Sequence, residues 1–87
     1  MEQGARNSRY DFAGFQFEAG PDPEDARRLR VLVLKDGAPF TDLHGQQMQK
    51  GFAPATGPAR IEQFCRRFAT DEAYRTQMLV KHAFACC

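Results

Sequence analysis

The chain has 87 residues, which is enough for one small domain whose core buries only a modest share of the unfolded surface. Twelve Lys and Arg residues and eleven Asp and Glu residues leave a net charge of +1, so no global field directs the protein toward nucleic acid or an anionic membrane. Three cysteines are too few for a secreted disulfide framework. The polar start and the lack of a long apolar run predict a cytoplasmic protein without a membrane segment.

The first half of the chain contains the strand signals. Residues 1–9 are polar and aperiodic, which predicts a flexible N-terminus ahead of a single α+β domain over residues 10–87. Aromatic residues alternate within 10–18, which predicts a strand, and the phase slips at Gly14, which predicts a bulge or tight bend. The segment that follows predicts a short helix, because Asp22 can cap it and Pro23 suits its first position.

A second strand is predicted over residues 29–35, where a run of aliphatic residues ends in the turn signal Asp36-Gly37. Pro39 cannot donate to a ladder, so residues 38–40 can supply at most a short edge strand. Residues 41–52 have a weak pattern that allows a short helix beginning at Thr41 or Asp42.

The C-terminal third has the clearest pattern. A helix over residues 58–69 is predicted because Ile61, Phe64, Cys65 and Phe68 share one face. The sequence Thr70-Asp71-Glu72 indicates a new cap, and residues 71–85 predict a second helix or the continuation of one kinked helix. The expected fold is a small antiparallel hairpin or sheet packed against C-terminal helices.

Four side chains of the C-terminal quarter are of the types that zinc or copper(I) prefers: Cys65, His82, Cys86 and Cys87. They lack the Cys-x-x-Cys or His-x-x-x-His pairs that structural zinc sites usually contain. The alternative is that Cys65 is a small apolar core residue and His82 a partly buried helix residue. The terminal pair is open to an intermolecular disulfide, to chemical modification or to no role at all.

No local signature of an enzyme is present. The stretch Asp42-Leu43-His44-Gly45 places an acid near an imidazole, but such a stretch is more typical of a turn than of a catalytic site. The arginines are interspersed with acids in a way typical of a solvated surface, so a nucleic-acid interface is a minor alternative. Apart from the zinc or copper considered above, the sequence predicts no cofactor.

The aromatic content gives the remaining functional signal. Eight Phe and two Tyr residues are a large load for so short a chain, and a surplus of rings at the surface would mark a partner-binding site. Phe40 and Phe52 flank the weakly patterned stretch and are the candidates for that site. We therefore expect a small non-enzymatic accessory or regulatory protein that binds a larger protein partner, and self-association is compatible with this expectation. The alternatives are a thiol-based metal-binding or redox protein that uses the C-terminal cysteines, and a small subunit of an enzyme complex.

Overall fold

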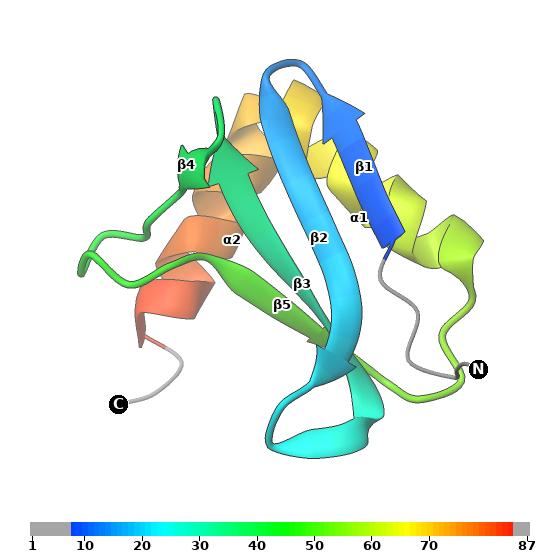
Figure 1. Ribbon diagram of the computed structural model, residues 1–87. Helices are drawn as coiled ribbons and strands as arrows, with labels where there is room; N and C mark the ends of the chain where they lie inside the picture. The colour runs from blue at the N-terminus through cyan, green and yellow to red at the C-terminus, as the bar shows by residue number, and fades with distance from the viewer. Residues whose placement is uncertain (1–7, 85–87) are drawn as a thin grey trace.

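The computed structural model describes residues 8–84, which form an antiparallel sheet with two helices on one of its faces (Figure 1). The elements are β1 (Ser8–Phe12), β2 (Phe15–Asp22), β3 (Asp25–Lys35), β4 (Ala38–Pro39), β5 (Gln49–Phe52), α1 (Pro58–Thr70) and α2 (Glu72–Phe84). The predicted α+β fold class, with its antiparallel sheet and two C-terminal helices, is confirmed. The segments 1–7 and 85–87 lie outside the described residues.

Tight turns divide the first part of the sheet into hairpins. Ala13 and Gly14 both have positive φ angles, of 51° and 85°, and join β1 to β2. Asp36 and Gly37, with φ angles of 51° and 84°, join β3 to β4 in the same way. Two consecutive positive φ angles produce the type I′ turn, whose twist matches that of paired strands. The single strand expected over 10–18 is therefore two strands, and the phase slip at Gly14 is a turn.

The helix expected to begin near Asp22 is absent, because β2 and β3 continue past each other as one long hairpin as far as the pair Asp22–Asp25. The Asp22 carboxylate accepts a hydrogen bond from the Glu24 N–H at 2.8 Å, and the Asp25 carboxylate accepts one from the Arg27 N–H at 3.1 Å. Short acidic side chains that bond to the backbone two residues ahead favour turns over helices. The same Asp-Pro signal thus closes a hairpin here.

The outer edge of β3 is shared by two short strands. β4 pairs with Leu34 and Lys35, as expected for an edge strand over 38–40, whereas β5 pairs with the earlier residues 29–32. Between the two strands the chain leaves the sheet as a loop over residues 41–47, closed by a bridge between Thr41 and Gln47. The short helix allowed in this region is therefore not formed.

Two separate helices follow, rather than one kinked helix. Pro58 occupies the first turn of α1, and the Asp71 carboxylate caps α2 by accepting a hydrogen bond from the Tyr74 N–H at 3.1 Å. The Arg75 guanidinium donates hydrogen bonds to the carbonyls of Phe68 and Ala69 at the end of α1, at 3.0 and 3.1 Å. These bonds satisfy carbonyls that the end of α1 leaves free.

The core lies between the two helices and the sheet face that they cover. Phe68 is fully buried at its centre and makes edge-to-face contacts with Phe15, Phe17 and Phe40, at centroid distances of 5.7, 5.9 and 6.1 Å. The buried apolar residues of this cluster are Phe15, Phe17, Ala19, Val31, Val33, Met48, Ile61, Phe64, Cys65, Phe68 and Ala69. The predicted apolar face of α1 is confirmed. Neither α1 nor α2, the helices of the described segment, has the length and apolar character needed to cross a membrane.

Candidate functional site

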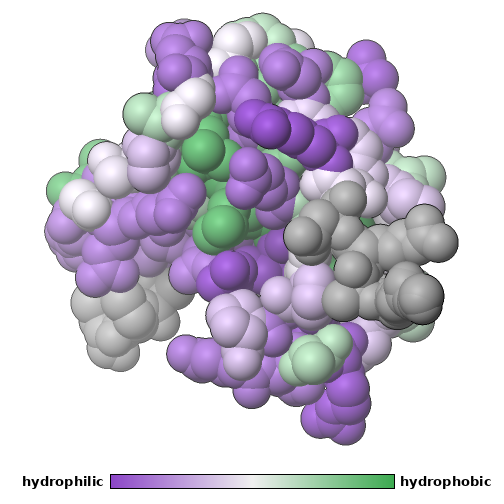
Figure 2. All heavy atoms as spheres, in the orientation of Figure 1, coloured by the Kyte–Doolittle hydropathy of each residue, from purple (hydrophilic) through white to green (hydrophobic). Residues whose placement is uncertain are grey.

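The second face of the sheet has no helix over it in the described part of the chain, and Figures 1 and 2 view the molecule from this side. Side chains alternate along a strand, so the neighbours of the buried residues of β2 and β3 point to this side. We call this surface the open face. Its side chains are those of Arg9, Asp11, Gln16, Glu18, Arg30, Leu32, Leu34 and Gln49.

The middle of the open face is apolar. Leu32 and Leu34 of β3 are only half-buried, although the residues that alternate with them, Val31 and Val33, are fully buried by the helices. Figure 2 shows apolar residues gathered over the middle of the sheet and hydrophilic residues around them. An apolar centre with a polar rim is the usual anatomy of a protein–protein interface.

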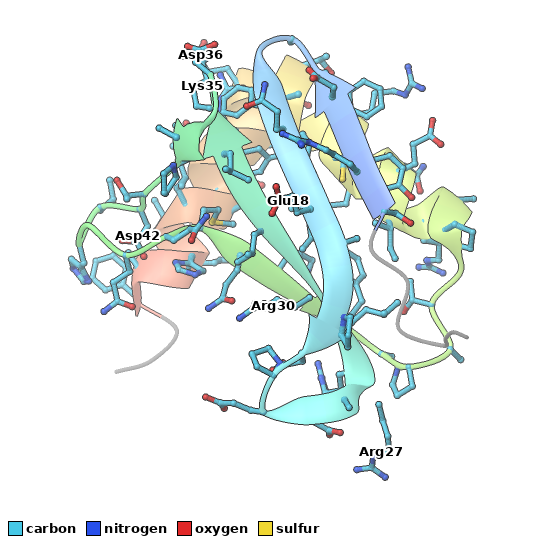
Figure 3. All side chains as sticks on the ribbon, in the orientation of Figure 1. Glu18, Arg27, Arg30, Lys35, Asp36 and Asp42 are labelled. Carbon is cyan, nitrogen blue, oxygen red and sulfur yellow. The ribbon has the colours of Figure 1, made fainter. Side chains whose placement is uncertain are left out.

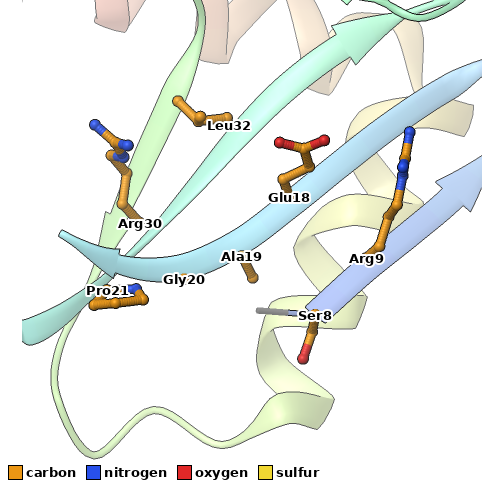
Figure 4. A pocket seen from close by; sticks show the side chains of 8 residues that line it. All are labelled: Ser8, Arg9, Glu18, Ala19, Gly20, Pro21, Arg30 and Leu32. Atoms are coloured by element: carbon orange, nitrogen blue, oxygen red, sulfur yellow. The ribbon is translucent and has the colours of Figure 1, made fainter. Parts of the chain in front are cut away.

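The charges of the open face are balanced. Arg9, Glu18 and Leu32 lie in one row across three strands, and Arg30 lies one row away (Figure 4). Together with Gly20 these residues line a shallow depression, and Figure 3 shows Glu18 and Arg30 on the viewer's side of the sheet. Two arginines and two carboxylates, counting Asp11, give this face no net charge. A polyanion such as nucleic acid would find no excess of cations here.

The two rings predicted to bind a partner lie at the rim of the core. Phe40 is half-buried and packs edge-to-face on Phe15 and Phe68, and Phe52 is half-buried and packs on Phe64 at 5.7 Å. Nine of the ten aromatic rings are buried or half-buried, and only Phe84 is exposed, at 59%. The core therefore accommodates most of the expected surplus of rings, and a role of Phe40 and Phe52 in partner binding stays a prediction.

A buried carboxylate joins the loop 41–47 to the end of α2. The Asp42 side chain accepts hydrogen bonds from the backbone N–H groups of His44 and Gln46, at 2.8 and 3.1 Å, and pairs with His82 Nδ1 at 2.5 Å. The His44 ring packs edge-to-face on Phe84 at 5.6 Å. The sequence suggested His44 as the imidazole nearest this acid, but the imidazole that pairs with Asp42 belongs to His82, 40 residues along the chain.

Hydrogen bonds set the charge state of this carboxylate. Burial raises the pKa of Asp42, but the hydrogen bonds from His82 and from the backbone of Gln46 and His44 outweigh it, so the net pKa lies below the ordinary value of 3.8. Asp42 is therefore ionised near neutral pH and anchors the loop. No serine, threonine or cysteine contacts the free side of His82 among the hydrogen bonds of residues 8–84. Within the described chain, the contacts of the Asp42–His82 pair are those of a structural link between the loop 41–47 and α2.

Within residues 8–84, the cysteine and histidine residues predicted as metal ligands do not form a common site. Cys65 is fully buried on α1, and burial raises the pKa of its thiol to about 12, so it stays protonated near neutral pH. His82 is held by Asp42. Within residues 8–84, no three His, Cys, Asp or Glu side chains are grouped as a metal site would require. Cys86 and Cys87 lie outside the described residues, so the thiol-based hypothesis stays a prediction.

The open face was not predicted from the sequence. Its signal was present in residues 29–34, Leu-Arg-Val-Leu-Val-Leu, which are apolar at nearly every position. A sheet covered on one face only requires apolar residues at alternate positions, so such a run is typical of a strand that is covered on both faces. Comparison of the chain with protein-family models, curated proteins and solved structures finds no match.

Proposed function

We propose that this protein is a non-enzymatic accessory or regulatory protein that binds a larger protein partner through the open face of its sheet. The observation that carries the proposal is the position of Leu32 and Leu34, which form an apolar centre on the sheet face that α1 and α2 leave uncovered. A partner that covers these two leucines would bury apolar surface that α1 and α2 leave in contact with water.

The occupant that best fits this surface is an amphipathic helix of the partner. A strand that is apolar on both faces normally has helices packed on both sides of its sheet, and here the helices cover one side. The rim offers Arg9 and Arg30 to acidic residues of the partner, and Asp11 and Glu18 to basic ones. The balance of these charges favours a protein over a nucleic acid as the ligand.

A position-specific crosslinking experiment tests this proposal. A photo-reactive amino acid is placed at Gln49 on the open face or, as the control, at Thr76, an exposed residue of α2. We expect adducts with a protein from the native lysate at Gln49 and none at Thr76. The crosslinked segment, made as a synthetic peptide, should then bind the purified chain and gain helical circular dichroism.

Substitutions give the matched control. Leu32→Glu with Leu34→Glu should abolish the Gln49 adduct, because it places charge at the apolar centre. Leu43→Glu, at a leucine that is 65% exposed on the loop 41–47, should leave the adduct intact. Equal adducts from both positions, an adduct that survives the double substitution, or a chain that yields no adduct at all would each contradict the proposal.

A further inference from the structure

The outer edge of β1 has the properties of a strand-pairing surface. β1 is the first strand of the sheet, and in the described chain no strand pairs with its outer side. It contains no proline, a residue that commonly blocks pairing at an edge. The opposite edge of the sheet is interrupted by Pro39 and by the loop 41–47. β1 is therefore the edge better suited to accept another strand.

The hairpin fixes which backbone groups of β1 point outward. Phe12 and Phe15 flank the two-residue turn and face each other, so the backbone groups of Phe12 point toward β2. Backbone groups alternate in direction along an antiparallel strand, so those of Tyr10 also point inward. The N–H and C=O groups of Arg9 and Asp11 point to the free edge.

The side chains of these two residues are complementary under a two-fold rotation. Arg9 and Asp11 are exposed, lie on the same side of the strand and are placed symmetrically about Tyr10. Antiparallel pairing centred on Tyr10 sets each Arg9 opposite the Asp11 of the second copy. In this register the outward backbone groups of both residues also meet, and opposite charges on facing residues stabilise the pair.

We propose that two copies of this chain associate through their β1 strands, paired antiparallel about a two-fold axis at Tyr10 to form one continuous sheet. The half-buried Tyr10 rings of the two copies become neighbours on the helix side. This inference goes beyond the proposed function and does not depend on it. Self-association is also a common means by which a small domain increases its buried surface.

The helix beside β1 also presents charged side chains of both signs near this edge. The Arg66 guanidinium of α1 lies over the Phe12 ring at 4.8 Å and pairs with Glu62 at 2.9 Å. Both charged groups therefore lie along α1 beside this edge.

Charge reversal tests the register of the pairing. Sedimentation velocity should give the wild-type chain a mass near twice 9.8 kDa. Arg9→Glu alone and Asp11→Lys alone each create two like-charge pairs per dimer and should weaken dimerisation about tenfold or more. An equimolar mixture of the two variants should recover a heterodimer, because the introduced carboxylate of one variant then faces the introduced ammonium group of the other, while the unchanged Asp11 faces the unchanged Arg9. Arg30→Glu, away from this edge, should leave the dimer unchanged.

Three results would overturn this inference. The first is a wild-type chain that stays monomeric up to about 1 mM. Only an association with a binding free energy weaker than about 4 kcal/mol would escape detection at this concentration. The second is a dimer that neither charge reversal weakens, which would place its interface elsewhere. The third is a mixture of the two variants that fails to associate although both keep the circular dichroism of the wild type. None of these measurements involves the partner of the open face, so the two proposals can fail separately.

Discussion

Replacing Phe68 by alanine tests whether the ring cluster holds the helices on the sheet. Truncation of a fully buried phenylalanine costs about 3–5 kcal/mol, and each aromatic pair contributes roughly 0.5–1.5 kcal/mol beyond its buried area. Phe68 makes edge-to-face contacts with three other rings, so we expect the upper part of the first range, about 4–5 kcal/mol. A domain of 87 residues has a total stability of roughly 4–13 kcal/mol.

Urea unfolding followed by circular dichroism measures this cost. Phe68→Leu keeps four of the seven side-chain carbons and should cost about 2 kcal/mol, which gives a measurable value if the alanine variant does not fold. Phe84→Ala is the control, because this ring is 59% exposed and should change stability by about 0.5 kcal/mol or less. A difference of less than about 1 kcal/mol between the unfolding free energies of Phe68→Ala and Phe84→Ala would show that the ring cluster does not hold the helices on the sheet.

Three further predictions concern single residues outside the ring cluster. The pKa of Asp42 is lowered in the folded state, so its contribution to stability is full above the ordinary value of 3.8 and is lost as pH falls through the lower folded value. Acid unfolding curves of the wild type and of Asp42→Asn should therefore differ, because the variant lacks this carboxylate. The Cys65 thiol, whose pKa is raised to about 12, should resist alkylation at neutral pH until urea unfolds the chain, as mass spectrometry of the modified peptide will show. Ala13 has a φ of 51° in its turn, so Ala13→Gly should raise the free energy of unfolding by roughly 0.5–1 kcal/mol in the same urea assay, since glycine has no Cβ penalty there.

The C-terminal helices could be predicted because their signals are local. The spacing of Ile61, Phe64, Cys65 and Phe68 defines a buried face whatever lies opposite it, and Asp71 caps the second helix as its position suggests. The strand at residues 29–35 was equally clear, because aliphatic residues follow each other there and end in Asp36-Gly37. A helix face or a strong turn dipeptide needs no information from the rest of the chain.

The hairpins of the first half were harder to predict because their signals have two meanings. Ala13-Gly14 lacks the Asn-Gly or Asp-Gly type of sequence that marks a type I′ turn, so the slip in phase predicts a bulge or tight bend within one strand rather than a turn between two strands. Asp22-Pro23 suits a helix start and a turn equally well, and the choice depends on whether β2 and β3 pair beyond it. The short strand β5 has no periodicity of its own and is defined by its partner β3.

The proposed binding surface and the Asp42–His82 pair are the parts that sequence patterns predict least. Asp42 and His82 are 40 positions apart and meet only because the loop 41–47 folds back on α2. To predict the open face, one must know that both helices pack on the same side of the sheet. A third layer on the other side would have buried Leu32 and Leu34. The apolar run at residues 29–34 shows that the strand is suited to cover on both faces, but it does not show which face remains free.

The two proposed surfaces are linked by symmetry even though they are independent in origin. Residues that face each other in an antiparallel pair lie on the same side of the sheet, so pairing β1 with β1 places both helical layers on one side and both open faces on the other. A partner that carries two suitable helices would then meet two apolar centres at a fixed separation and bind with increased avidity. Arg9→Glu should in that case weaken capture of such a two-helix partner more than it weakens binding of a single isolated helix, because only the two-helix partner needs the dimer. Leu32→Glu, at the apolar centre, should weaken both.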